Sequence, residues 1–265
     1  MGKFFDEIPP HIVSWIQRQK MFWVATAPMT ADGHVNVSPK GYAGTFHIVD
    51  SKKVWYEDMS GSGVETIAHI RENGRMTIMF CAFEGAPQIV RLFGTGTVYE
   101  VDTPEYNAMI PVEKRIEGSR SVIMLDIYKV SSSCGYGVPY YTYKAPRKTL
   151  RSFLGKMEGE DLKAAASTGT PHDEMTWPEK GIRALWKTSN LTSLDGLPGL
   201  QSALGSAPVF VDREGASELE ELSDGGYNSR RWGERWNALL DTRFIAGATV
   251  GVAASIISTR LLATP

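Results

Sequence analysis

Short runs of alternating apolar and polar residues fill the first half of the chain and predict β-strands. Such a period-two pattern, bounded by turn residues, is typical of half-buried strands. Six runs are strand-like, of which the fourth is apolar rather than alternating: residues 21–26, 35–42, 54–56, 76–83, 89–101 and 121–130. Three segments have helical spacing instead: residues 8–20, 64–72 and 104–115. The pattern therefore predicts six strands and three helices within about 135 residues.

The turn signals between these runs favour antiparallel pairing. Asp32-Gly33 predicts a hairpin between the first two strands, and Asn73-Gly74 ends the helix before the fourth. Gly94 and Gly96 interrupt the fifth strand and indicate a bulge or a bend. No strand leads through G-x-G-x-x-G into a helix, which argues against a dinucleotide-binding parallel sheet. We expect a mainly β fold with flanking helices, built as a small Greek-key or split barrel over residues 8–135.

Beyond residue 135 the pattern is looser. Residues 136–205 form an extension in which a basic helix over 140–157 precedes a polar, turn-rich stretch over 159–178. Residues 206–230 are acidic and contain Gly225-Gly226, which predicts a flexible linker. Residues 231–263 are expected to form a C-terminal helical tail.

The tail is open to two interpretations. Residues 244–259 carry no charge, and a helix extended to Leu262 would be about 28 Å long, close to the hydrocarbon thickness of a bilayer. Gly247 and Gly251 form a G-x-x-x-G motif, and upstream Arg and Trp residues suit a membrane interface. Residues 244–262 would then anchor the chain to a membrane. The alternative is an Ala- and Gly-rich helix that packs on a soluble partner or frays.

Composition and charge narrow the function classes. The 265 residues carry 28 Lys and Arg against 30 Asp and Glu, so the net charge is −2. This balance argues against nucleic acid as the main partner, and the composition argues against a disordered or polytopic membrane protein. The two cysteines, Cys81 and Cys134, form no metal motif and are expected to be buried, inert thiols. The acidic residues Asp6 and Glu7 do not suit a signal peptide, so we expect a cytoplasmic chain, with the tail as its one candidate membrane tether.

The strongest local signal for chemistry is Ser60-Gly61-Ser62-Gly63, which runs directly into a predicted helix. A helix N-terminus presents unpaired N–H groups, and glycines let a phosphate approach them. Hydroxyls of Ser60 and Ser62 would add donors. The simpler interpretation is a flexible strand-to-helix turn with a serine N-cap.

Two cations lie on neighbouring predicted strands. Lys40 follows Ser38-Pro39 at the end of the second strand, and Arg91 interrupts the apolar pattern of the fifth. Lys40 either reaches an anion or protects an edge strand, and Arg91 either meets a charge in a cleft or extends to solvent. Lys40, Arg91 and the helix start together could hold one dianionic phosphate.

The order of these motifs resembles the pyridoxamine 5′-phosphate oxidase-like FMN-binding split barrels, in their uncharacterised fungal and bacterial branch. The likeness spans about residues 10–200 and rests on Asn36-Val37-Ser38-Pro39-Lys40-Gly41, Gly61-Ser62-Gly63-Val64-Glu65-Thr66, Ala68-His69, Glu72-Asn73-Gly74-Arg75, Met79-Phe80-Cys81-Ala82-Phe83, Arg91-Leu92-Phe93-Gly94, Ser133-Cys134-Gly135-Tyr136-Gly137-Val138-Pro139 and Leu194-Asp195-Gly196-Leu197-Pro198-Gly199-Leu200.

The resemblance implies a six-stranded antiparallel split β-barrel that forms a homodimer with FMN at the subunit interface. Its implied cofactor-binding residues are Ser38, Lys40, Tyr56, Glu57, Ser60, Ser62, Gly63 and Arg91. Lys40 matches the phosphate-binding lysine of the family, and Tyr56 with Glu57 matches the pair beside the flavin. The oxidases place an Arg-Lys pair at the start of the phosphate-binding helix, where this chain has Glu65 and Thr66.

The chain is accordingly expected to be an FMN-dependent oxidoreductase with a small-molecule substrate other than pyridoxamine phosphate, because the oxidases' C-terminal substrate module is absent. The alternative is a non-catalytic module that binds flavin or haem. No catalytic residue is assigned. His47 and His69 are candidate proton donors or ordinary core or surface histidines. No protein-bound metal is expected, since the histidines show no ligand spacing.

Overall fold

The structure is a computed structural model that describes residues 2–168 and 177–206. The predicted linker, apart from its first residue, and the predicted tail helix with its uncharged segment 244–262 lie outside the described residues. Within the described part of the chain, no helix is long and apolar enough to cross a membrane.

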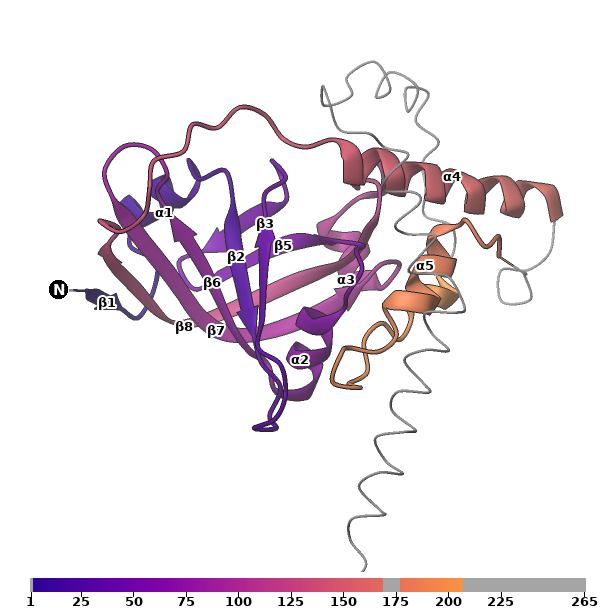
Figure 1. Ribbon diagram of the computed structural model, residues 1–265, viewed down its shortest axis with the longest axis horizontal. Helices are drawn as coiled ribbons and strands as arrows, with labels where there is room; N and C mark the ends of the chain where they lie inside the picture. Colours follow the sequence, from indigo (N-terminus) through magenta and orange to yellow (C-terminus); the bar gives the residue numbers. More distant parts are fainter. Residues whose placement is uncertain (1, 169–176, 207–265) are drawn as a thin grey trace, which may run out of the picture. The chain divides into compact units, whose positions relative to one another are not determined.

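One antiparallel sheet forms the body of the protein (Figure 1). Its order is β3-β2-β6-β7-β8-β5-β4, and β1 pairs with β8. The strands are β1 (Lys3–Phe5), β2 (Phe22–Thr26), β3 (Asn36–Lys40), β4 (Phe46–Asp50), β5 (Lys53–Met59), β6 (Arg75–Cys81), β7 (Gln88–Glu100) and β8 (Ser119–Cys134). The six predicted strands are present, and the mainly β split-barrel class is confirmed. β1 and β4 were not predicted from the pattern.

The barrel core follows from the alternation of side chains. Directly opposite residues on β2, β6, β7 and β8 form one inward-facing row, and each is 0% exposed: Val24, Ile78, Leu92 and Val130. Opposite residues in antiparallel strands share a face, so this row is buried as a unit. Burying such aliphatic side chains contributes about 1.5–3 kcal/mol each to folding.

Side chains of the two edge strands, β3 and β4, contact other strands of the sheet across the barrel. The ring of Phe46 on β4 lies 5.0 Å from that of Phe22 and 5.1 Å from that of Phe80. On the β3 side, Lys40 Nζ lies 2.8 Å from Asp58 Oδ1 on β5. Aromatic packing and one buried ion pair therefore close the split of the barrel.

The predicted irregularity of the long strand is confirmed at Gly94. The register between β7 and β8 shifts between Phe93 and Gly94. A Cβ at Gly94 would overlap the carbonyl oxygen of Asp126, so the bulge requires glycine.

Helices cover the ends of the barrel: α1 (Pro10–Ile16), α2 (Glu65–Asn73), α3 (Pro104–Met109), α4 (Thr149–Thr168) and α5 (Ile182–Ser189), with 3₁₀ turns at Val112–Lys114 and Ala203–Gly205. Gly74 ends α2 with φ of +70°, as the Asn-Gly signal predicts. The predicted helix over 104–115 is shorter, because it stops before Pro111.

The predicted bounds of the helix in the extension were wrong. Residues 140–148 are irregular, and the helix α4 occupies 149–168, where a turn-rich stretch was expected from residue 159. Pro146 disfavours helical conformation in the residue before it, which delays the start. The good helix formers over 160–166 then carry the helix onward.

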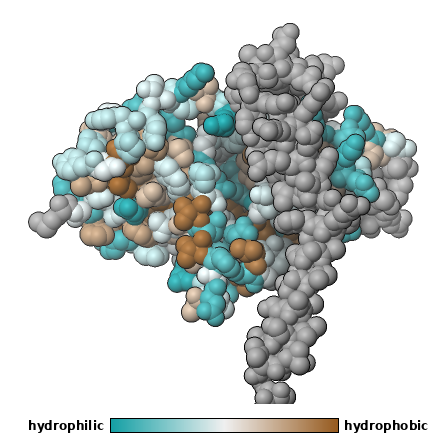
Figure 2. All heavy atoms as spheres, in the orientation of Figure 1, coloured by the Kyte–Doolittle hydropathy of each residue, from teal (hydrophilic) through white to brown (hydrophobic). Residues whose placement is uncertain are grey.

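The extension packs on one end of the barrel. Arg115 Nη2 donates to Glu158 Oε1 on α4 at 2.7 Å, and Trp186 Nε1 on α5 donates to Ser60 Oγ at 2.7 Å. Figure 1 shows α4 and α5 side by side at that end, and the two helices are in contact. Hydrophobic groups on the face drawn in Figure 2 form small clusters, several of them over the β2–β3 hairpin.

Candidate functional site

A cavity of about 350 Å³ opens between the end of β3, the end of β5 and the loop that leads into α2. We call it the Lys40 cavity. Six of the eight residues predicted as cofactor-binding line it: Ser38, Lys40, Glu57, Ser60, Ser62 and Gly63. Strands far apart in the sequence therefore bring these predicted residues together.

Lys40 is the central cation of this cavity. It pairs across the sheet with the buried Phe22, so its side chain lies on the inner face of β3. Its Nζ lies 2.8 Å from Asp58 Oδ1 and 5.7 Å from the centroid of the Tyr56 ring. The charged end is thereby held at the mouth of the barrel, still partly open to solvent.

Arg120, at the start of β8, is a second cation of the cavity that sequence reasoning missed. Its Nε donates to Asp58 Oδ2 at 2.8 Å, and its Nη1 donates to the Gly63 carbonyl at 2.9 Å. Burial raises the pKa of the Asp58 carboxyl, but Lys40 and Arg120 outweigh that effect and hold the pKa below its usual value. A charged residue opening a buried strand was the available signal, but the sequence does not show its partner.

The loop before α2 has the properties expected of an anion site. Val64 is the N-cap of α2 and provides no side-chain cap, so the first helical N–H groups of this nine-residue helix have no such acceptor. Ser62 is exposed beside them. Ser60 is fully buried, and its Oγ accepts the Trp186 hydrogen bond, so this serine fixes the loop to α5.

Glu57 provides a carboxyl group in the cavity wall. Its Oε1 accepts a hydrogen bond from the Ile116 amide at 3.0 Å. Burial raises the pKa of Glu57, against the opposing effects of the Ile116 hydrogen bond and nearby Arg115. A buried carboxyl with a raised pKa, facing a cavity, is a candidate for proton exchange.

Tyr56 and Arg91 lie elsewhere. Tyr56 is 0% exposed and packs behind the cavity wall, beneath Lys40. Across neighbouring strands, Arg91 lies opposite Met79, Met79 lies opposite Trp23, and Trp23 lies opposite Pro39. Arg91 therefore shares the face of Pro39, opposite to that of Lys40. The cradle predicted from Lys40, Arg91 and the helix start does not form within one chain.

The predicted histidines and cysteines fall into ordinary settings, with one correction. His47 stacks on Trp55 at 3.8 Å, and His69 is buried with Nδ1 3.0 Å from Thr26 Oγ1. Cys81 is buried as expected, but Cys134 is exposed, because it is the last residue of β8. Among the described residues no His, Cys, Asp and Glu side chains gather as a metal site.

Comparison with known proteins places this site in a family context. Residues 8–134 match the family described as pyridoxamine 5′-phosphate oxidase. The chain is 39% identical over 222 residues to the pyridoxamine 5′-phosphate oxidase family protein ustO of Aspergillus flavus. The alignment covers 80% of this chain and 83% of ustO.

Solved structures with a similar fold match about half of the chain. A variant of HupZ from group A Streptococcus is 23% identical, with a TM-score of 0.40, over 48% of this chain and 99% of that one. A putative pyridoxamine 5′-phosphate oxidase from Lactobacillus delbrueckii is 20% identical, with a TM-score of 0.38, over 48% of this chain and 94% of its own.

Proposed function

Because the chain belongs to the pyridoxamine 5′-phosphate oxidase-like family, we propose that it is an FMN-dependent oxidoreductase that holds the FMN phosphate in the Lys40 cavity. The observation that carries the proposal is the convergence of Lys40, Ser62 and the uncapped start of α2 on one cavity of about 350 Å³.

The donor set of this cavity fits a phosphate group. Lys40 and Arg120 bring two positive charges, Asp58 pairs with both of them, and Glu57 and Glu65 also line the cavity. The Ser62 hydroxyl and the first N–H groups of α2 add neutral donors without any side-chain cap in competition. Oriented N–H groups and an ammonium are the groups that bind phosphate at helix N-termini.

The residues of the chain would divide the work as follows. FMN, when bound, supplies hydride or electron transfer. Lys40 and Ser62 bind the phosphate and set the position of the cofactor, while Asp58 and Arg120 hold the Lys40 ammonium in place. Glu57, whose pKa is raised by burial, is the carboxyl that we propose exchanges a proton with groups in the cavity.

The substrate is proposed to be a small molecule other than pyridoxamine phosphate. Glu65 and Thr66 occupy the positions where the oxidases place an Arg-Lys pair, so this helix start carries less positive charge. The Glu65 side chain also lies against Gly63, where a Cβ would overlap it. These differences bear on the FMN phosphate, whereas pyridoxamine phosphate is disfavoured because the oxidases' C-terminal substrate module has no counterpart in the sequence.

We also propose that the chain acts as a homodimer. The edge strand β3 and the residue before it leave Val37 and Val35 59% and 72% exposed, and an edge with exposed β-branched residues is suited to covering by a second copy. Light scattering on the full-length chain tests this: a mass of two chains supports the proposal, and a mass of one chain rejects it.

The FMN proposal is tested by titrating the purified full-length chain with FMN and following the quenching of flavin fluorescence. We expect saturable binding, and about tenfold or more weaker binding in Lys40→Met, because a charge-assisted contact contributes about 1.5–3 kcal/mol. Lys53→Met is the matched control, since Lys53 pairs with Asp126 on the same sheet outside the cavity.

Turnover separates an enzyme from a binding module. Bound FMN that is reduced by a nicotinamide donor and reoxidised by oxygen or an added acceptor supports the oxidoreductase. Bound FMN that none of these partners turns over supports a non-catalytic flavin-binding role. Absence of FMN binding, or unchanged affinity in Lys40→Met, rejects the assignment of the phosphate to this cavity.

A further inference from the structure

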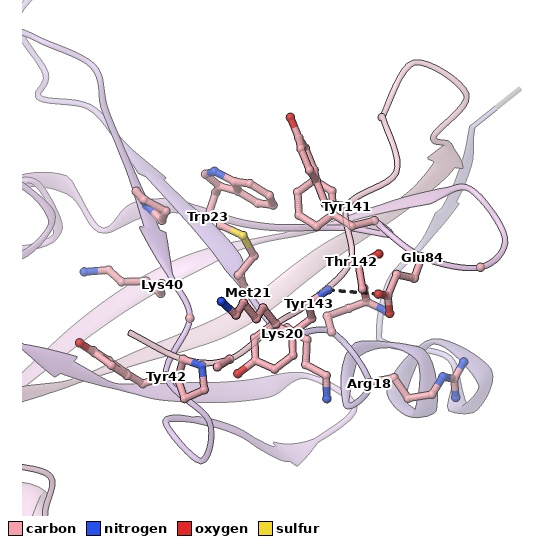
Figure 3. Close-up of a pocket in the computed structure, with 18 of the residues that line it drawn as sticks. Arg18, Lys20, Met21, Trp23, Lys40, Tyr42, Glu84, Tyr141, Thr142 and Tyr143 are labelled. Carbon is pink, nitrogen blue, oxygen red and sulfur yellow. Dashed lines mark hydrogen bonds between the residues drawn. The ribbon is translucent and has the colours of Figure 1, made fainter. Parts of the chain in front are cut away.

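A second and larger cavity, of about 1,020 Å³, lies next to the Lys40 cavity (Figure 3). One side is built from α1, the start of β2 and the end of β3, and the other from residues 141–147, which cross over it as an irregular segment. We call this segment the strap and the space the strap cavity. Its volume is that of a site for a drug-sized ligand.

The strap is held over the cavity by few contacts. The Tyr141 amide donates to the Phe83 carbonyl at 3.2 Å, and the Tyr143 amide donates to Glu84 Oε1 at 3.2 Å (Figure 3). Every residue of the strap is exposed. Exposed tyrosines over a cavity gain favourable burial only when something fills the space between them and the sheet.

Aromatic rings form a continuous wall of this cavity. The Trp23 ring lies 5.9 Å from that of Phe83, which lies 5.3 Å from that of Tyr141. Figure 3 shows Trp23 and Tyr141 on the same side of the cavity. Such a wall offers flat apolar surface to a planar ring.

The cavity is also strongly positive. Its lining contains five cationic side chains against one carboxylate: Arg18, Lys20, Lys40, Lys144 and Arg147 against Glu84. Lys40 is paired with Asp58, and Lys20 lies over the Tyr143 ring at 5.6 Å. Lys144 and Arg147 line the cavity from the strap and are the cations that we assign to the ligand.

The two cavities share one wall. Pro39, Lys40, Gly41 and Tyr42 line both of them. A molecule in the strap cavity would therefore lie next to a cofactor whose phosphate occupies the Lys40 cavity. The smaller cavity lacks such an aromatic wall: its lining combines Lys40 and Arg120 with serine, glycine and acidic residues.

We propose that the strap cavity is the substrate site and that it selects a planar aromatic carboxylate. The aromatic wall of Trp23, Phe83 and Tyr141 stacks on the ring, and Lys144 and Arg147 bind the carboxylate. The identification as a substrate site rests on the proposed FMN function, whereas binding of an aromatic anion does not.

The test uses three probes of nearly equal shape and different charge on the full-length chain loaded with FMN: indole-3-acetate, indole-3-acetamide and tryptamine. Isothermal titration calorimetry should show the anion binding at least about tenfold more tightly than the neutral amide, and the cation binding most weakly. Equal affinity for acid and amide overturns the charge selection.

Strap variants locate the site. The double variant Lys144→Ala/Arg147→Ala should reduce indole-3-acetate affinity about tenfold and leave FMN affinity unchanged. The matched control Lys163→Ala/Lys187→Ala removes two exposed cations outside the cavity and should change neither. Tyr141→Ala should weaken all three probes, and Tyr141→Phe should restore them, because the ring and not the hydroxyl makes the wall. Unchanged probe affinity in the strap variants places the site elsewhere and rejects the proposal.

The two proposals fail separately. If the chain does not bind FMN but still selects the acid through Lys144 and Arg147, the proposed cofactor is wrong and the anion site stands without its role as a substrate site. If FMN binds and the acid is not preferred, the strap proposal is wrong and the FMN proposal stands.

Discussion

Asp58 shows how one buried carboxylate connects the fold to the site. It is 0% exposed and lies between Lys40 on β3 and Arg120 on β8, so it joins an edge of the sheet to its centre. Removing one member of a buried ion pair costs about 3–5 kcal/mol, because the partner charge stays buried. The cation that we assign to phosphate is therefore also part of the closure of the barrel, whereas Lys53, whose pair with Asp126 is exposed, controls only for the loss of a surface lysine.

His69 illustrates a buried residue that bridges the barrel and the extension. Asn36 Nδ2 donates to Thr26 Oγ1 at 3.2 Å, and the Thr26 hydroxyl is hydrogen-bonded to His69 Nδ1 at 3.0 Å. His69 Nε2 faces Asp195 Oδ2 at 3.9 Å. Burial lowers the pKa of His69 below its ordinary 6.5, and the carboxylates of Asp195, Glu65 and Glu72 only partly oppose this.

This lowered pKa predicts a loss of stability on acidification. Below about pH 6.5 the unfolded chain takes up a proton at His69 more readily than the folded chain, so the free energy of unfolding falls until the folded-state pKa is passed. Above pH 6.5 the contribution is complete. Urea unfolding at pH 7.5 and pH 5.5 should show that the advantage of the wild type over His69→Gln shrinks at the lower pH. The same difference at both values, or an equal change in the exposed-histidine control His11→Gln, contradicts this account.

At the scale of elements, α5 supports the loop that carries the proposed phosphate site. Trp186 is 0% exposed and donates to Ser60 Oγ at 2.7 Å, and Asn190, which follows α5, donates to the Gly61 carbonyl at 2.9 Å. The family model matches residues 8–134, so this support comes from the extension that follows it. We infer that the extension helps to hold in place the loop that carries the proposed phosphate site.

Trp186→Phe should therefore weaken both the fold and the site. The change leaves the buried Ser60 hydroxyl without its donor, and a lost buried hydrogen bond costs about 1–3 kcal/mol. We expect unfolding at lower urea concentration and FMN binding weaker by about threefold. Trp55→Phe is the control, since Trp55 stacks on His47 outside the cavity. A variant as stable as the wild type, with the same FMN affinity, would show that α5 does not support the loop.

At the scale of the whole molecule, the sequence was sufficient to predict the barrel and most residues of the candidate site. Strand-like runs and turn signals located the six main strands, and six of the eight residues predicted from the motif order line one cavity. Local patterns were less informative where the pairing of distant strands determines the position of an element or a side chain. β4 was missed because Phe46–Asp50 has neither strict alternation nor a clear turn signal before Lys53. The side of the sheet that Arg91 occupies depends on the strand register, which no local pattern determines.

The partnership of Arg120 with Asp58 was likewise out of reach, because the two residues are 62 positions apart and meet only when β5 pairs with β8. The strap cavity depends on an irregular segment crossing the sheet, for which the sequence offers no periodic signal. Position on the sheet, rather than residue type, separates the Lys40 that lines the site from the Arg91 that does not.

The central claim is that the Lys40 cavity binds the phosphate of FMN, and comparing FMN with riboflavin tests it most directly. Riboflavin has the same ring system and lacks the phosphate, so the ratio of the two dissociation constants measures the phosphate contribution alone. We predict that the full-length chain binds FMN about tenfold or more tightly than riboflavin, and that Lys40→Met removes most of this preference while Lys53→Met retains it. Equal affinity of the wild type for both flavins, or an unchanged preference in Lys40→Met, would contradict the account.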